Sequence, residues 1–307
     1  MEKYMCGIAG IKYKNGPGPL GRDLFEIMDG VAHRGPDSVG IGLYGQKVPS
    51  DRIKMKVRVN LPTTSTKYKP QSEKLFASIK RMGGTILDTQ QFEDTYRLII
   101  QYNKSVKALA NSLLKIKYVE VQSVGHLLEV SKAVGAPSEL EKQVEMSSFI
   151  GTHGIAHTRL ATESDILVST SHPFWAYGYN DVAVVHNGQL TNYWRLRRWL
   201  ETRGWRFTTE NDTELIAIYV ADMLDRGYEL RETLDRSIDD LDGTYSFLVS
   251  TEGQIGFAKD RLGAKPLVVA DGDDYVAMAS EEVGIQRMVH DPNLRTYEPY
   301  PLKVQTW

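Results

Sequence analysis

The residue best suited to chemistry is Cys6, the single cysteine of a 307-residue chain. A thiol becomes a good nucleophile once its proton is removed. An α-amino group, with an ordinary pKa of about 7.7–8.0, can remove that proton. If Cys6 were the first residue, its own amine could act as the base through water, and no histidine or aspartate partner would be needed. A lone cysteine is more often a small buried hydrophobe, but its place five residues from the start, before Gly7, favours catalysis.

A single cysteine excludes an intramolecular disulfide, and it cannot hold an iron–sulfur cluster. No carboxylate or cysteine stands at ligand spacing from the histidines, so we expect no metal site. Structural hydrogen bonding is the predicted role of four histidines beside expected strands, His33, His153, His157 and His186.

Six short blocks resemble the class II glutamine amidotransferases, which are N-terminal-nucleophile hydrolases, and they occur in the order of that family. They are CGIAG at 6–10, HRGPDS at 33–38, GIAHTRLAT at 154–162, SHPF at 171–174, HNGQL at 186–190 and NDTE at 211–214. Further matches at 241–243 and 260–267 extend the resemblance over nearly all of the chain outside residues 46–148. The resemblance implies a four-layer αββα fold and hydrolysis of the side-chain amide of L-glutamine.

The resemblance also implies a role for each matching residue. The side-chain amide of Asn187 and the backbone N–H of Gly188 match the donors to the oxyanion that forms when Cys6 attacks. Arg159 matches the residue that binds the α-carboxylate of glutamine, and Asp212 the partner of its α-ammonium group. Weaker matches are Thr162, for a further carboxylate contact, and His172 and Arg34, for the lining of the pocket.

Taken one at a time, these residues have structural alternatives. Asn187 and Gly188 could form only a hairpin turn. Arg159 and Asp212 could form a structural ion pair. Asp212 could also be the N-cap of the helix that follows it.

Five residues, Met1 to Met5, precede Cys6, so the nitrogen of Cys6 in this sequence is an amide that cannot act as a base. Translation could start at Met5, with that methionine then removed, or residues 1–5 could be a short propeptide. We therefore expect a structure of the full sequence to show an unprocessed site.

The hydrophobic pattern predicts an α+β fold. The main domain, at 6–45 and 149–305, has predicted strands at 6–13, 39–44, 149–157, 182–186, 244–250, 253–259, 266–270 and 275–280, and helices at 20–31, 190–203 and 213–226. Residues 46–148 form an expected insert with strands at 52–60, 84–91, 94–102 and 117–123 and helices at 71–82 and 104–115. This β-α-β-β-α-β order is that of a ferredoxin-like unit.

The composition indicates a globular protein, with 41% hydrophobic and 25% charged residues and a formal net charge of −2. That balance argues against a nucleic-acid or membrane-surface binder. The absence of a long apolar run and of a signal peptide predicts a cytoplasmic location.

No acceptor domain follows residue 305, so we expect the ammonia to pass to another polypeptide. The chain most resembles the stand-alone amidotransferase subunits of split glutamate synthases and of N-methylglutamate synthase. That resemblance implies a partner subunit with FMN and iron–sulfur clusters, a second partner with a glycine-rich β-helix, and no cofactor in this chain. Two alternatives stay open: a stand-alone γ-glutamyl hydrolase, and a non-catalytic regulatory subunit that keeps its first five residues.

Overall fold

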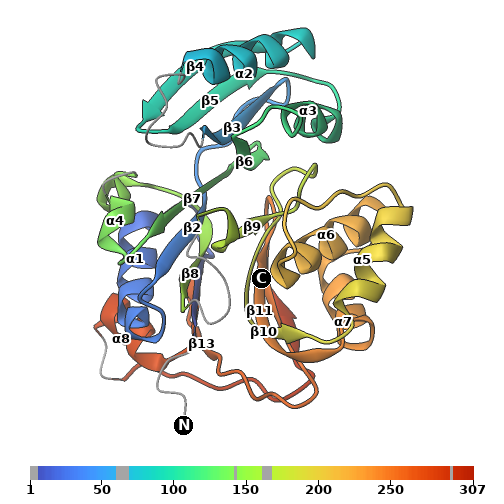
Figure 1. The fold of residues 1–307 in the computed structure, drawn as a ribbon. Coiled ribbons are helices and arrows are strands. Elements are labelled where there is room, and N and C mark those ends of the chain that lie inside the picture. The colour runs from blue at the N-terminus through green and yellow to red at the C-terminus, as the bar shows by residue number, and fades with distance from the viewer. Residues whose placement is uncertain (1–5, 60–68, 142–143, 161–167, 291–292) are drawn as a thin grey trace.

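Two antiparallel sheets lie at the centre of the protein, and helices cover the outer face of each (Figure 1). A computed structural model describes residues 6–59, 69–141, 144–160, 168–290 and 293–307. The six-stranded sheet has the order β13-β14-β1-β8-β2-β7, with β1 (Gly7–Tyr13), β2 (Ser38–Tyr44), β7 (Leu128–Val134), β8 (His153–Arg159), β13 (Val268–Asp271) and β14 (Tyr275–Ala279). The five-stranded sheet has the order β15-β12-β11-β10-β9, with β9 (Phe174–Trp175), β10 (Ala183–Leu190), β11 (Gly243–Ser250), β12 (Ile255–Lys259) and β15 (Val304–Thr306).

Amphipathic helices form the outer layers. The six-stranded sheet is covered by α1 (Leu20–Gly30) and α8 (Glu282–Val289), and the short helix α4 (Ser138–Glu141) contacts β7. The five-stranded sheet is covered by α5 (Tyr193–Thr202), α6 (Asp212–Asp225) and α7 (Leu230–Asp240). In α1, Leu20, Leu24, Ile27 and Met28 recur at helical spacing and are fully buried, which fixes the face that packs on the sheet. The layer order is therefore αββα, as predicted.

A third sheet stands above the two central ones in Figure 1. It has the order β4-β5-β3-β6, with β3 (Arg52–Val59), β4 (Thr85–Phe92), β5 (Thr95–Gln101) and β6 (Val119–Gly125). Two helices accompany it, α2 (Lys69–Arg81) and α3 (Val106–Leu113). The element order β-α-β-β-α-β is the one that the sequence predicts.

Strand β3 is buried on both faces. Its apolar residues, Ile53, Met55, Val57 and Val59, are buried as their alternation predicts. On the opposite face Lys54 and Lys56 are also buried, because β7 lies against them. Lys54 pairs with Glu129 at 3.0 Å, and Lys56 donates a hydrogen bond to the hydroxyl of Ser131. Polar partners thus satisfy charges that the alternation would place in solvent.

The predicted end of the insert at residue 148 needs correction, because β7 pairs with β2 along its whole length and so belongs to the six-stranded sheet. Helices α7 and α8 are not predicted from the sequence, and β8 begins at residue 153, four residues later than the predicted start at 149. Residues 149–151 instead pass beside the start of α1, where Gly18 and Gly151 form an isolated bridge.

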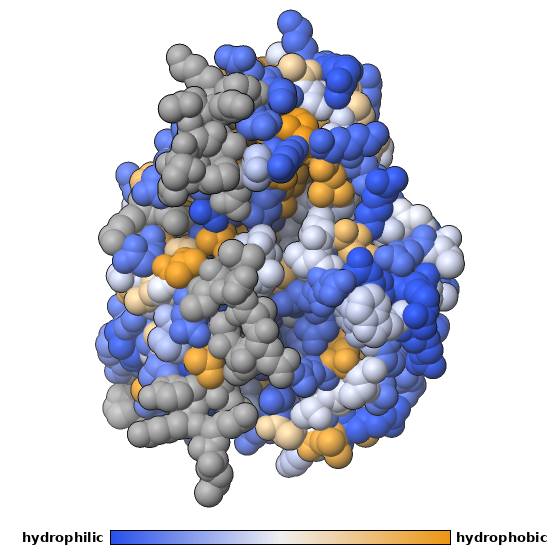
Figure 2. Space-filling view, viewed as in Figure 1, coloured by the Kyte–Doolittle hydropathy of each residue, from blue (hydrophilic) through white to orange (hydrophobic). Residues whose placement is uncertain are grey.

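Within the described residues, no helix has the length and apolar character needed to cross a membrane. Most of the face in Figure 2 is hydrophilic, and its apolar residues occur in separate groups.

Candidate active site

Cys6 lies immediately before β1, between the neighbouring strands β8 and β14. Its half-buried thiol donates to the carbonyl of Leu160 at 3.9 Å. A Cβ on Gly7 would lie 2.6 Å from the Thr158 hydroxyl and 2.9 Å from Val31, so only glycine fits here. Burial raises the pKa of the Cys6 thiol, although the nearby guanidinium of Arg159 acts in the opposite direction.

Asn187 reaches Cys6 from the other sheet, and Gly188 follows it in β10. The amide nitrogen of Asn187 donates to the backbone carbonyl of Cys6 at 2.9 Å. Both residues lie within β10 and pair with Ser246 and Tyr245 of β11, so the alternative of a hairpin turn is wrong. Gly188 has φ of 137°, and a Cβ there would lie 2.0 Å from the carbonyl oxygen of Thr244. The position therefore requires glycine.

Arg159 ends β8, beside Cys6, and its guanidinium donates to the hydroxyl of Thr170 at 3.1 Å. Asp212 is the first residue of α6. The N-cap is instead Asn211, which accepts from the backbone of Thr213 at 2.9 Å, so the alternative of a cap at position 212 is wrong. Arg159 and Asp212, both in the described ranges, do not form an ion pair with each other. That structural alternative is therefore also wrong.

The carboxylate of Asp212 accepts from the backbone N–H of Leu190 at 3.1 Å and lies 3.4 Å from Nδ1 of His186. Burial alone would raise the pKa of Asp212, but His186 and neighbouring backbone N–H groups outweigh burial and lower it. An ionised carboxylate at the start of α6 is therefore available to hold an ammonium group.

Three buried histidines lie behind Asp212. The hydroxyl of Thr213 hydrogen-bonds to both His172, at 3.1 Å, and His186, at 3.2 Å. His157 hydrogen-bonds to the carbonyl of His186 at 3.2 Å, and its ring lies 4.0 Å from that of His172. Burial lowers the pKa of His157 to about 3 and that of His172 well below its usual range, so both are neutral at pH 7. The predicted structural hydrogen bonding of His157 and His186 is confirmed.

The other two histidines also have structural partners, as predicted. His153 bonds to Thr152 at 2.9 Å and to the carbonyl of Thr251 at 2.8 Å. His33 lies 3.1 Å from the carboxylate of Glu281.

Arg34 contacts Cys6 directly: its Nε donates to the carbonyl of Cys6 at 3.1 Å, and its guanidinium pairs with Glu281. No motif in the sequence predicts a role for Ser280, whose buried hydroxyl accepts from the backbone of Ile8 at 2.9 Å and from Asn187 at 3.2 Å. Its only signal is a polar residue at the end of a predicted strand. Thr162 and residues 1–5 lie outside the described residues, so the predicted carboxylate contact and the unprocessed N-terminus stay predictions.

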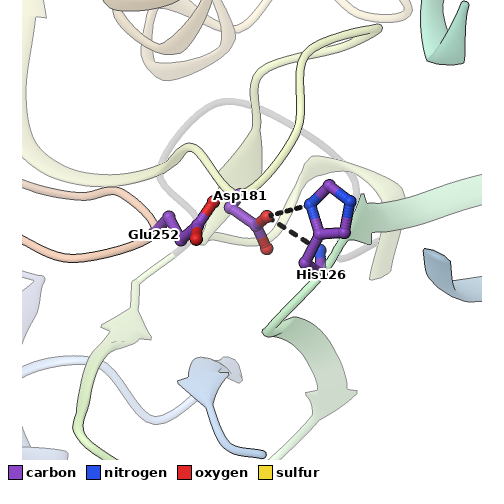
Figure 3. Close-up of side chains that lie close together, drawn as sticks. All are labelled: His126, Asp181 and Glu252. Carbon is purple, nitrogen blue, oxygen red and sulfur yellow. Dashed lines mark hydrogen bonds and ion pairs between the residues drawn. The ribbon is translucent and has the colours of Figure 1, made fainter. Parts of the chain in front are cut away.

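A second cluster consists of His126, Asp181 and Glu252, which are distant in sequence (Figure 3). Their possible ligand atoms all lie within 4.8 Å of one another. Spacing in the sequence gives no sign of it. Asp181 accepts from the backbone N–H groups of residues 126, 127 and 128 at 2.7–2.9 Å, and lies 3.4 Å from the His126 ring. These three backbone donors, with the nearby His126 ring, satisfy most of the carboxylate. Glu252 pairs with Lys47. Asp181 therefore holds the backbone in place where the chain leaves β6.

The sequence and fold match known glutamine amidotransferases. Residues 157–287 match the family model for the glutamine amidotransferase domain. A protein of Methanothermobacter thermautotrophicus named "Putative glutamine amidotransferase" is 36% identical over 308 residues, which cover 98% of this chain and 99% of the relative. Glutamine amidotransferase-like protein GlxB of Rhizobium meliloti is 32% identical over 99% of this chain and 98% of its own length.

Among solved structures, the glutamine phosphoribosylpyrophosphate amidotransferase of B. subtilis, in complex with ADP and GMP, has a TM-score of 0.60 at 20% identity. That match covers 98% of this chain and 47% of the other, so the chain spans about half the length of that enzyme and shares its fold. The chain belongs to the glutamine amidotransferase family, in its class II branch.

Proposed function

We propose that this chain is the glutaminase subunit of a synthase, hydrolysing L-glutamine to glutamate and ammonia with Cys6 as the nucleophile. The approach of Asn187 to Cys6 across the two sheets, with its amide nitrogen 2.9 Å from the Cys6 carbonyl, carries the proposal. It places a neutral N–H donor next to the nucleophilic residue, where an oxyanion would develop.

In the first step the free amine of a processed Cys6 takes the thiol proton, and the thiolate attacks the amide carbon of glutamine. The carbonyl oxygen becomes an oxyanion held by the Asn187 amide and the Gly188 N–H. Collapse of this intermediate breaks the C–N bond, and the α-ammonium of Cys6 returns a proton to the departing nitrogen. The products are ammonia and a thioester between Cys6 and the glutamyl group.

In the second step water attacks the thioester through the same oxyanion site and releases glutamate and the thiol. Arg159 binds the α-carboxylate of the substrate during both steps, and Asp212 binds its α-ammonium group. Together they select free glutamine over glutamine within a protein. These groups are positioned by Arg34 and by the cluster of His157, His172, His186 and Thr213.

The ammonia passes to a partner synthase of the glutamate synthase or N-methylglutamate synthase type. FMN and iron–sulfur clusters belong to that partner, and this chain needs no cofactor of its own. We place the complex in the cytoplasm.

The third sheet and its helices, at 52–125, form the ferredoxin-like insert. Its strand order β4-β5-β3-β6 supports this proposal, because its first strand lies inside the sheet and pairs with the third and the fourth. The amidotransferase domain then comprises the residues before and after it, including β7.

The test is glutamate release from glutamine by a form that begins at Cys6. We expect activity that disappears in Cys6→Ala and increases when an FMN and iron–sulfur synthase subunit is added. Unchanged hydrolysis by Cys6→Ala would falsify the proposal. Faster hydrolysis of γ-glutamyl conjugates than of free glutamine would favour the γ-glutamyl hydrolase instead. Retention of Met1 to Met5 in the intact mass of the native protein would favour the regulatory subunit.

A further inference from the structure

A cavity of about 320 Å³ lies between the insert and the amidotransferase domain. Strands β6, β7 and β9 and the loop before α6 supply its described lining, which contains neither Cys6, Asn187, Arg159 nor Asp212. Its volume is that of a site for a small metabolite.

Three polar groups, those of Tyr177, Glu120 and Lys132, line this cavity. The hydroxyl of Tyr177, a residue only 3% exposed, is buried and unpartnered, as is Oε2 of Glu120. Lys132 is 6% exposed; its ammonium lies 4.7 Å above the ring of Phe174 and forms no hydrogen bond with the described residues. Buried polar groups are almost always hydrogen-bonded, so the unpartnered Tyr177 hydroxyl and Glu120 oxygen, with the Lys132 ammonium beside them, point to a ligand in this cavity.

Glu120 and Lys132 have opposite charges and face the same space, yet they do not form an ion pair with each other. Burial lowers the pKa of Lys132 and raises the pKa of Glu120, and each residue partly offsets the effect on the other. Arg58, which also acts on Glu120, is already paired with Asp94 at 2.6 Å. The two charges are therefore available to groups of opposite sign on one molecule.

Glu214 also lines the cavity but is not available. Its two oxygens accept four hydrogen bonds, from the backbone and hydroxyl groups of Thr208 and Thr209, at 2.6–2.7 Å. Its lone pairs are thus fully used. The polar recognition in the cavity rests on Lys132, Glu120 and Tyr177.

The remaining wall is aromatic. Phe174 and Trp175 come from β9, and the rings of Trp175 and Tyr177 lie 5.3 Å apart. We propose that the cavity binds a zwitterionic α-amino acid with an apolar or aromatic side chain. Its carboxylate would contact Lys132 and the Tyr177 hydroxyl, its ammonium group would contact Glu120, and its side chain would pack on the aromatic wall. A simple anion or cation would leave one buried charge unpaired.

The glutamine site is close, since Phe174 contacts His172 and Ser169 precedes the Thr170 that holds Arg159. A test must therefore separate the two sites. Calorimetric titration with L-phenylalanine is the measurement, and the matched probes are 3-phenylpropionate, which lacks the ammonium group, and phenethylamine, which lacks the carboxylate. We expect saturable binding of phenylalanine, with each one-charge probe weaker by roughly tenfold or more.

Lys132→Met and Glu120→Gln are each expected to weaken phenylalanine binding by roughly tenfold to a hundredfold. Lys80→Met, which alters an exposed lysine of α2, should bind normally, and so should Asp212→Asn, which damages only the glutamine site. If a charge variant fails to fold, Tyr177→Phe removes only the hydroxyl and should still weaken binding. The proposal is overturned if phenylalanine gives no saturable heat, if either one-charge probe binds as tightly, or if Asp212→Asn abolishes binding.

Discussion

At the scale of single residues, Asn187 is the most informative contact, because its amide reaches Cys6, the proposed nucleophile. Asn187→Ala removes a hydrogen-bond donor that stabilises the negative charge developing on the substrate oxygen. We expect kcat to fall by about 10²–10³ with little change in KM. Steady-state glutamine hydrolysis by the form that begins at Cys6 measures this. Gln189→Ala, on the exposed side of the same strand, is the control and should retain activity. A similar loss in both variants would contradict a role in the oxyanion site.

Gly188 is required by the backbone as well as by the chemistry. Gly188→Ala would force a side chain into a conformation with φ of 137° and within 2.0 Å of the Thr244 carbonyl. We expect a loss of about 2–5 kcal/mol in the free energy of unfolding, measured with urea. Gly204→Ala is the matched control, because φ there is 84° but nothing lies within 4 Å. Equal losses of unfolding free energy in the two variants would mean that the close approach to Thr244 does not destabilise Gly188→Ala.

Short motifs are the local signal for Cys6, Asn187 and Asp212, and the fold brings the first two into contact. No such signal exists for Ser280, because the role of this hydroxyl depends on β14 lying next to β1, some 270 positions away in the chain. A single serine before a helix offers no local pattern for that contact. The alternative of an N-cap at Asp212 fails for a simpler reason: Asn211 and Asp212 are both good caps, and only the geometry separates them.

At the scale of elements, the hydrogen bonds from the backbone of residues 126–128 to Asp181 fix the segment that joins the insert to the six-stranded sheet. Asp181→Ala would leave three backbone N–H groups of residues 126–128 without an acceptor. We expect the free energy of unfolding to fall by about 2–5 kcal/mol, as measured with urea. EDTA should leave the unfolding midpoint of the unmodified protein unchanged, since backbone donors already occupy the carboxylate. A midpoint lowered by EDTA would show instead that the cluster binds a metal.

The buried histidines join both sheets to α6 and should make stability depend on pH. His157 stays neutral in the folded protein down to about pH 3, whereas in the unfolded chain it takes up a proton below about pH 6.5. The unfolded state therefore binds more protons in that window, and stability falls as the pH falls from about 6.5 toward 3. His157→Gln should reduce the slope of unfolding free energy against pH by about 1.4 kcal/mol per pH unit. His290→Asn, at an exposed position, should leave the slope unchanged, and an unchanged slope in His157→Gln would refute the prediction.

The missed strand β7 shows why patterns alone could not place the end of the insert. Apolar Leu128 and Val130 alternate with Glu129 and Ser131, which suggests one solvent-facing side. In the folded protein both sides are buried, because Lys54 and Lys56 of β3 cover the polar one. Such pairing across two units leaves no trace in the local hydrophobic period.

At the scale of the whole molecule, the two sheets bring the N-terminal part of the chain together with residues near 160, 187, 212 and 280. This assembly exists while Cys6 is still preceded by five residues, so the site can form before its base does. Folding and activation are then separate events. Under the proposed mechanism, activation is the release of the nitrogen of Cys6.

The reactivity of Cys6 tests this separation directly. In the full chain burial raises the pKa of the thiol, and its nitrogen is an amide, so the thiolate fraction at neutral pH is small. A form that begins at Cys6 gains an amine beside the sulfur, and its ammonium form favours the thiolate. We expect alkylation by iodoacetamide at neutral pH to be about tenfold faster in that form than in the full chain, the effect of one pKa unit. A form with one glycine before Cys6 is the matched control, because it removes the same bulk but keeps the amide. Alkylation of that control as fast as the form beginning at Cys6 would show that exposure of the thiol, and not the free amine, determines its reactivity.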